Sequence, residues 1–171
     1  MLAGCTGGGS ERTETAEEPA NPRLRVGDRA LSSAFPVELV EPDAGNIDAP
    51  AHGDARIGSV HWHEDERHTH WHFGPLEVPR GGTREVRIRY LDQDLETVPV
   101  GDGEPYRVDV SVVSASPEGL LSVEQDGDRI ILDGEAVGDG RLGLELRCNG
   151  ELAWEAPELE VAVIEGETGD G

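Results

Sequence analysis

The segment Leu142-Gly-Leu144-Glu-Leu146-Arg-Cys148 places an apolar residue at every second position. Because side chains alternate between the two faces of a β-strand, this spacing predicts a strand with one buried face, which includes Cys148 as a buried thiol. The same period of two recurs in Val86-Arg-Ile88-Arg-Tyr90 and in Val108-Asp-Val110-Ser-Val112, whose apolar residues are expected to face inward. Helical periodicity is missing from about residue 24 onward, so the sequence predicts an all-β protein.

Turn signals separate the alternating segments at intervals of about 8 to 12 residues. They consist of Gly, Pro and Asp-Gly, and Asp126-Gly127-Asp128 is a typical hairpin turn. This spacing favours an antiparallel β-sandwich. The predicted strands span residues 36–41, 57–63, 68–78, 84–91, 106–114, 120–125, 129–133, 141–148 and 159–164.

The charge of the chain is strongly negative. Its 171 residues include 36 Asp and Glu against 14 basic residues, all of which are Arg, for a net charge of −22. A net charge of this sign opposes binding to a phosphate backbone, so no nucleic-acid partner is expected. So many carboxylates repel one another unless salt screens them, and the Debye length falls to about 3 Å in molar salt. The composition therefore predicts an extreme halophile.

The first five residues resemble the end of a bacterial lipoprotein signal. Leu2-Ala3-Gly4-Cys5 fits the lipobox of that family, whose last residue is lipidated. No charged region or apolar stretch of about 7 to 15 residues precedes it, and a start site placed too far downstream would explain that departure. The resemblance implies a lipid anchor on Cys5, a position on the extracellular face of the cell membrane, and no other membrane contact. Residues 6–23, rich in Gly, Ser, Thr, Glu and Pro, are then expected to form a disordered tether.

The C-terminal half resembles the bacterial immunoglobulin-like domains of group 2. The resemblance rests on Leu76-Glu-Val78 with Gly82-Thr83 and the strand to Leu91, on 106–116 and 121–123, on Leu132-Asp-Gly134 with Gly138 and Leu142, and on Leu159-Glu-Val161-Ala-Val163. The resemblance covers residues 74–165 and implies that they form an immunoglobulin-like β-sandwich. Residues 24–73 are then expected to form N-terminal strands with a His-rich hairpin, and residues 166–171 a disordered tail. The Glu and Arg at strand ends and the long 99–105 insertion depart from the family pattern. Such domains are structural or adhesive modules, so no enzymatic activity is implied.

All six histidines lie between residues 52 and 72, and five of them stand within His61–His72. If residues 64–67 form the loop of a hairpin, His63 faces His68 and His61 faces His70. Every histidine of the hairpin then falls on one face, while Val60, Trp62, Trp71 and Phe73 fall on the other. A shift by one residue would mix the two faces, so the pattern specifies this pairing.

The histidine spacing suits a transition metal. Opposed positions on paired strands place Cβ atoms about 4.5–5.5 Å apart, close enough for imidazole nitrogens to converge on one ion. Three or four imidazoles are what Zn²⁺ accepts, and Cu²⁺ or Ni²⁺ bind similar donors. The predicted metal ligands are His61, His63, His68, His70 and His72, with His52, Glu64 and Glu66 as weaker or supporting candidates.

Two functions remain open from the sequence. The first is a surface-anchored, immunoglobulin-like lipoprotein that binds a transition metal, zinc in the first place. The second is a structural or adhesive surface module without a metal, whose histidines are surface residues that become charged below about pH 6.5. Its protein partner is not predicted.

Overall fold

The computed structural model describes residues 25–26, 29–32, 35–43, 56–63 and 68–166, with the backbone alone at 25–26, 62–63 and 68. The described residues form strands and turns and contain no helix. Accordingly, they include no helix that is long and apolar enough to cross a membrane. The predicted lipobox at 1–5, the tether at 6–23 and the end of the tail lie outside the described residues.

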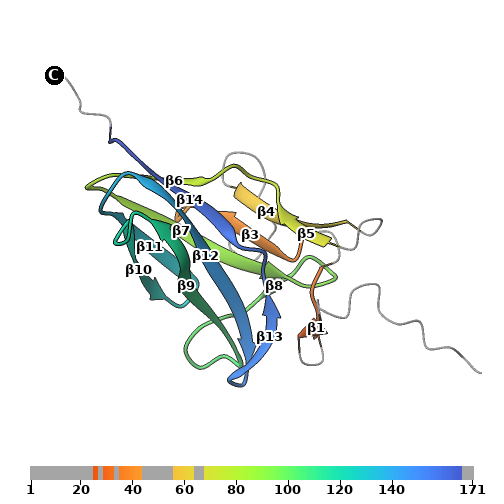
Figure 1. The fold of residues 1–171 in the computed structure, drawn as a ribbon. Helices are drawn as coiled ribbons and strands as arrows, with labels where there is room; N and C mark the ends of the chain where they lie inside the picture. Colours follow the sequence, from red (N-terminus) through yellow and green to blue (C-terminus); the bar gives the residue numbers. More distant parts are fainter. Residues whose placement is uncertain (1–24, 27–28, 33–34, 44–55, 64–67, 167–171) are drawn as a thin grey trace, which may run out of the picture.

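Two sheets pack face to face to form a β-sandwich, which confirms the predicted fold class (Figure 1). The first sheet has the order β10-β11-β7-β3-β4-β5, and β8 pairs with β7 beside this path. Its strands are β3 (Val37–Val40), β4 (Arg56–His63), β5 (His68–Trp71), β7 (Thr83–Leu91), β8 (Thr97–Val98), β10 (Leu121–Asp126) and β11 (Arg129–Gly134).

The second sheet is built around the long strand β12. Strand β9 lies along one side of β12, whereas β13 and β14 share the other side, and β6 pairs with β14. All of these pairs are antiparallel except β14 with β6, which is parallel. The strands are β6 (Leu76–Pro79), β9 (Tyr106–Ser116), β12 (Gly138–Cys148), β13 (Glu151–Glu155) and β14 (Leu159–Ile164); β1 (Arg25–Val26) and β2 (Arg29–Ala30) form a separate hairpin.

The strand order within residues 74–165 is immunoglobulin-like. If β6, β7, β9, β10, β11, β12 and β14 are lettered A to G, one sheet contains D-E-B and the other contains C-F-G, with A paired to G. The hairpin β4–β5 and strand β3 extend the D-E-B sheet beyond β7, because β3 pairs with β7 on one side and with β4 on the other. One sheet therefore combines strands from residues 24–73 and 74–165.

The core between the sheets follows the predicted alternation closely. Leu142, Leu144 and Leu146 are fully buried, as are the inward residues of β7. The prediction for β9 is wrong at Val112, which is 43% exposed. Val112 is still paired with the buried Leu142, but β9 lies at the edge of its sheet, and a bulge follows at Val113.

Three further features differ from the sequence prediction. The single strand predicted at 68–78 is two strands, β5 and β6, which belong to different sheets, because Gly74 and Pro75 break the ladder between them. Strand β13 was not predicted, and it carries Trp154 into the core, where the Trp154 ring meets Tyr90 edge-on at 6.1 Å. Cys148 is only half-buried, since it ends β12 beside the Asn149-Gly150 turn.

Candidate functional site: the histidine face of the β4–β5 hairpin

The β4–β5 hairpin has the register that the sequence predicts. Val60 pairs with Trp71, His61 with His70, Trp62 with Thr69, and His63 with His68. The ladder continues beyond β5, because the backbone N–H of His72 donates to the carbonyl of Ser59 over 2.8 Å. The five histidine positions of the hairpin therefore share one face.

The opposite face of the hairpin packs into the sandwich. Val60 is completely buried, and Trp71 and Phe73 are partly buried against the core. The indole N–H of Trp71 donates to the carbonyl of Pro157, which precedes β14 in the other sheet, over 2.8 Å. Phe73 lies over Gly58, where a Cβ would come within 2.8 Å of the Phe73 ring. These contacts fix the hairpin and leave its histidine face outward.

Three imidazoles gather on this outer face. His61 Nδ1 and His72 Nε2 are 3.1 Å apart, so one of the two nitrogens donates a hydrogen bond to the other. The rings of His61 and His72 lie 4.9 Å apart between centroids, and those of His70 and His72 lie 4.5 Å apart. Residues on two strands and on the segment after β5 thus meet in one cluster, which we call the histidine cluster (His61, His70 and His72).

The spacing of the nitrogens resembles that of metal ligands. Two nitrogens bound to one tetrahedral Zn²⁺ at about 2.0–2.1 Å lie about 3.3 Å apart. The separation of 3.1 Å between His61 and His72 is close to this value. Within the part of the chain that the structure describes, no group of three or more His, Cys, Asp or Glu side chains has the geometry of a metal site. The described cluster therefore offers two converging nitrogens with a third ring beside them.

A stacked side chain orients His61. The Phe35 ring stacks on the His61 ring with centroids 5.3 Å apart and an angle of 16° between their planes. The guanidinium carbon of Arg56 lies 5.6 Å from the centre of the Phe35 ring, within the range of a cation–π contact. Phe35 therefore holds the His61 ring in the plane that directs Nδ1 toward His72.

A buried ion pair underlies the same face. Glu38 of β3 pairs in register with Arg89 of β7 and Ser59 of β4. The Glu38 carboxylate lies 3.9 Å from Arg89 and 3.5 Å from Arg56, and the side chains of Glu38 and Arg89 are only 2% and 3% exposed. The Glu38 carboxylate thus pairs with Arg89 in the first sheet and with Arg56. Arg56 in turn contacts Phe35, which stacks on His61 of the histidine cluster.

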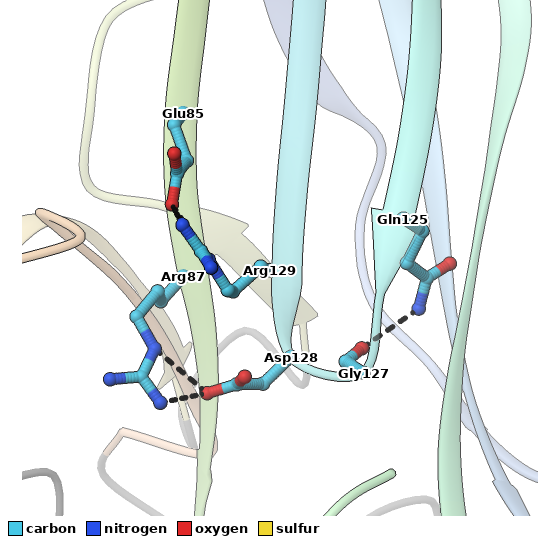
Figure 2. Close-up of polar contacts among 6 residues, drawn as sticks. All are labelled: Glu85, Arg87, Gln125, Gly127, Asp128 and Arg129. Atoms are coloured by element: carbon cyan, nitrogen blue, oxygen red, sulfur yellow. Dashed lines mark hydrogen bonds and ion pairs between the residues drawn. The ribbon is translucent and has the colours of Figure 1, made fainter. Parts of the chain in front are cut away.

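Further ion pairs, partly buried or exposed, link residues of β7 to β11 and to the turn before it. Arg87 Nε and Nη2 donate to one oxygen of Asp128 over 3.0 and 2.5 Å, and Arg129 binds Glu85 (Figure 2). The hydrogen bond with Glu85 raises the pKa of Arg129 above its usual value. Every arginine whose side chain the structure describes forms an ion pair with at least one carboxylate. Among the arginines with described side chains, none is left to form a basic patch.

A groove of about 250 Å³ opens beside the histidine cluster. His70 and Trp71 line one side of it, and Glu158, Glu160 and Arg141 line the other. Arg141 is neutralised by Glu158 at 3.1 Å, so the groove has a net negative charge. Such a groove attracts cations toward His70.

The predicted ligands divide into two groups. His61, His70 and His72 come together in the cluster, while His63 and His68 are placed by their backbone pairing alone. The supporting candidates His52, Glu64 and Glu66, and the lipidation candidate Cys5, lie outside the described residues.

Sequence reasoning missed Phe35, which stacks on His61, and the buried pair Glu38 and Arg89. A signal for Glu38 was present, since it is the one charged residue in the apolar run Phe35-Pro-Val-Glu-Leu-Val40. A carboxylate within a buried strand needs a buried cation, and Arg89 lies directly opposite. Phe35 offered no such signal, because its contact with His61 depends on the packing of a loop onto β4.

Comparisons with known proteins give distant likeness to solved structures alone. No protein-family model matches the chain, and no curated protein is significantly similar to it. Among solved structures, the chain is similar to a crystal structure of domains 4 and 5 of the S-layer protein SbsC, at 12% identity and a TM-score of 0.40, over 75% of each chain. This likeness is too distant to transfer a function.

Proposed function

We propose that this protein is a surface-anchored, immunoglobulin-like lipoprotein of a halophile that binds a transition metal, zinc in the first place, through the β4–β5 hairpin. The observation that carries the proposal is the convergence of His61 Nδ1 and His72 Nε2 to 3.1 Å on a hairpin whose histidines share one face. In this proposal the protein acts as a binding module and not as an enzyme.

The metal is held by several imidazoles of this face. His61 and His72 supply two nitrogens at nearly the required separation, and rotation of the adjacent His70 ring brings in a third. His63 and His68, paired next along the ladder, supply further ligands. Phe35 keeps His61 in place without touching the metal, as outer-shell residues do at metal sites. The negative groove beside His70 raises the local concentration of cations.

The anchor and the habitat rest on the sequence. Cys5 ends a lipobox-like motif and is followed by a Gly-, Ser- and Thr-rich segment that suits a tether. The net charge of −22 with no lysine suits a surface that is exposed to molar salt. The ion pairs of every arginine whose side chain is described also support a function that does not involve nucleic acid.

Calorimetric titration of the metal-free full chain with Zn²⁺, Cu²⁺ and Ni²⁺ in molar salt tests the proposal. We expect stoichiometric, sub-micromolar binding at about pH 7.5 and loss of binding at about pH 5.5, because imidazole ligands must be deprotonated. The paired variants H61A/H72A and H63A/H68A should each weaken binding at least tenfold. Thr69→Ala, on the opposite face of the same hairpin, is the matched control and should bind like the wild type.

The alternative is a structural or adhesive surface module that binds no metal. It predicts only weak heats from carboxylate association, which would be the same for the wild type and for H61A/H72A. In that case the contact between His61 and His72 would be a hydrogen bond within an ordinary polar surface.

A further inference from the structure

Strand β5 is the last strand of the first sheet. It pairs with β4 on one side, and no strand among the described residues pairs with its other side (Figure 1). The backbone N–H of His72 donates to the carbonyl of Ser59, so these two residues form a hydrogen-bonded pair of the antiparallel ladder. Such pairs alternate along a ladder, and the backbone N–H and C=O of Thr69 and Trp71 therefore point away from β4. We call this side of β5 the free edge.

Two other edge strands of the sandwich carry protection that β5 lacks. Strand β10 carries the charges of Glu124 and Asp126. The first half of β9 is capped by Gln125, whose side-chain amide donates to the carbonyl of Val108 and accepts from the N–H of Val110 over 3.2 Å. Strand β5 contains no acidic residue, arginine or proline. An edge without such protection is able to pair with a further strand.

The groove beside the histidine cluster lies against this free edge. Trp71 and Phe73, both half-buried, form its aromatic wall. A second groove of about 350 Å³ continues it across the outer face of the second sheet, since the two share Arg141 and Glu160. The second groove adds the carboxylate of Asp139.

The chemistry of the joined grooves fits a guanidinium group. Three carboxylates, those of Asp139, Glu158 and Glu160, line them against the one guanidinium of Arg141. Arg141 is paired with Glu158, whereas Glu160, its neighbour in the ladder of β12 and β14, forms no ion pair among the described residues. Guanidinium groups stack on aromatic rings and pair with carboxylates, and this wall and this carboxylate offer both contacts.

A strand added to the free edge would direct side chains toward the groove. Every strand pair of the first sheet is antiparallel, so the same arrangement is expected for an added strand. In it, the residue opposite Trp71 exchanges backbone hydrogen bonds with Trp71 and lies on the same face. From this face the Trp71 indole reaches the carbonyl of Pro157, which directly precedes Glu158. The side chain opposite Trp71 therefore lies on the groove side, and its neighbours along the added strand point to the histidine face.

We propose that the free edge of β5 binds an extended segment of a partner protein, in which arginine alternates with uncharged residues and one arginine enters the groove beside Trp71 and Glu160. Backbone hydrogen bonds to Thr69 and Trp71 supply affinity, and the groove supplies specificity. The occupant is a basic segment because the groove is acidic and the whole chain has a net charge of −22. The binding needs no metal, since the arginines lie on the face opposite the histidines.

Fluorescence anisotropy of a dye-labelled synthetic peptide tests the proposal, with the full chain in molar KCl and EDTA at about pH 7.5. The probe is a short peptide in which Arg alternates with Thr, and we expect saturable binding with a Kd of about 100 µM or below. Citrulline, which has nearly the shape of arginine without its charge, should weaken binding at least fivefold. Glu160→Arg should weaken it at least tenfold. The matched control is Glu151→Arg, the same change of charge at an exposed position of β13, which should bind like the wild type.

Backbone methylation of the peptide tests the strand pairing separately. A methyl group on the Arg nitrogens blocks the donors that face β5, whereas a methyl group on the Thr nitrogens lies on the open side. The first peptide should lose binding, and the second should bind like the parent peptide. Equal binding of the two methylated peptides, wild-type binding by Glu160→Arg, or no saturable binding of the parent peptide overturns the proposal. A chain that sediments as a dimer without peptide, and as a monomer after Thr69→Pro, would assign this edge to a second copy and overturn it as well.

Discussion

Replacing Glu38 with Leu should destabilise the protein more than any change to its exposed ion pairs. The Glu38 and Arg89 side chains are 2% and 3% exposed, so the substitution leaves the Arg89 guanidinium buried without this carboxylate. Breaking a buried pair in this way costs about 3–5 kcal/mol. The lost contact with Arg56, which is 38% exposed, adds at most about 1 kcal/mol.

The double variant E38L/R89M separates the charge from the packing. Removing both charges leaves two apolar side chains in the same space, and such replacements are often neutral or stabilising. We therefore expect the double variant to recover most of the stability that Glu38→Leu loses. In that case the broken charge pair between Glu38 and Arg89, and not the changed shape of either side chain, accounts for the stability that Glu38→Leu loses.

Urea unfolding in molar salt, followed by tryptophan fluorescence, measures these effects. With a slope of about 2 kcal/mol per molar urea, a loss of 3–5 kcal/mol lowers the midpoint by about 1.5–2.5 M. Glu85→Gln, which removes the exposed pair with Arg129, is the control and should change the free energy of unfolding by less than about 1 kcal/mol. A loss below about 1 kcal/mol for Glu38→Leu, or a double variant no more stable than the single one, would refute the reasoning.

Three further changes test other contacts. Gly58→Ala should cost about 1–3 kcal/mol in urea unfolding, because its Cβ would lie 2.8 Å from the Phe73 ring. Burial raises the pKa of Tyr90, so above about pH 10 the tyrosine ionises in the unfolded state and stays neutral in the folded state, which favours unfolding. Tyr90→Phe has no such group and should therefore lose less stability than the wild type between about pH 9 and 11. Gln125→Leu should speed amide hydrogen exchange at Val110 at least tenfold, because the side-chain acceptor is removed.

The first two changes have controls. Gly74→Ala, where no atom lies within 4 Å of the new Cβ, should leave the free energy of unfolding within about 0.5 kcal/mol. At about pH 7.5, Tyr90→Phe should be at least as stable as the wild type, since the Tyr90 hydroxyl has no hydrogen-bond partner among the described residues. An unchanged exchange rate at Val110 in Gln125→Leu would contradict the role given to the Gln125 amide.

The hairpin could be predicted from the sequence because two independent patterns select the same register. The alternation of His61 and His63 with Trp62, and of His68 and His70 with Thr69, leaves one pairing that separates polar from apolar faces. The sandwich could be predicted for the same reason, since burial of one face imposes a period of two on every strand.

The remaining features depend on contacts between segments that are distant in the sequence. The prediction of one strand over residues 68–78 missed the break at Gly74 and Pro75, although both residues commonly interrupt strands. The transfer of the chain from one sheet to the other carries no sequence signal. The exposure of Val112 and the bulge that follows it at Val113 both occur in an edge strand, and the alternating sequence of β9 does not show which strands lie at an edge. The stacking of Phe35 on His61 joins residues 26 positions apart through aromatic packing that carries no sequence period.

The proposal that the histidine face binds a metal is tested most directly by zinc K-edge X-ray absorption of the stoichiometric complex, in molar salt at about pH 7.5. The account predicts low-Z ligands at about 2.0 Å, with the outer-shell scattering of at least three imidazoles, and fewer imidazoles in H61A/H72A. A spectrum fitted by carboxylate and water oxygens alone, and identical for the wild type and H61A/H72A, would contradict it.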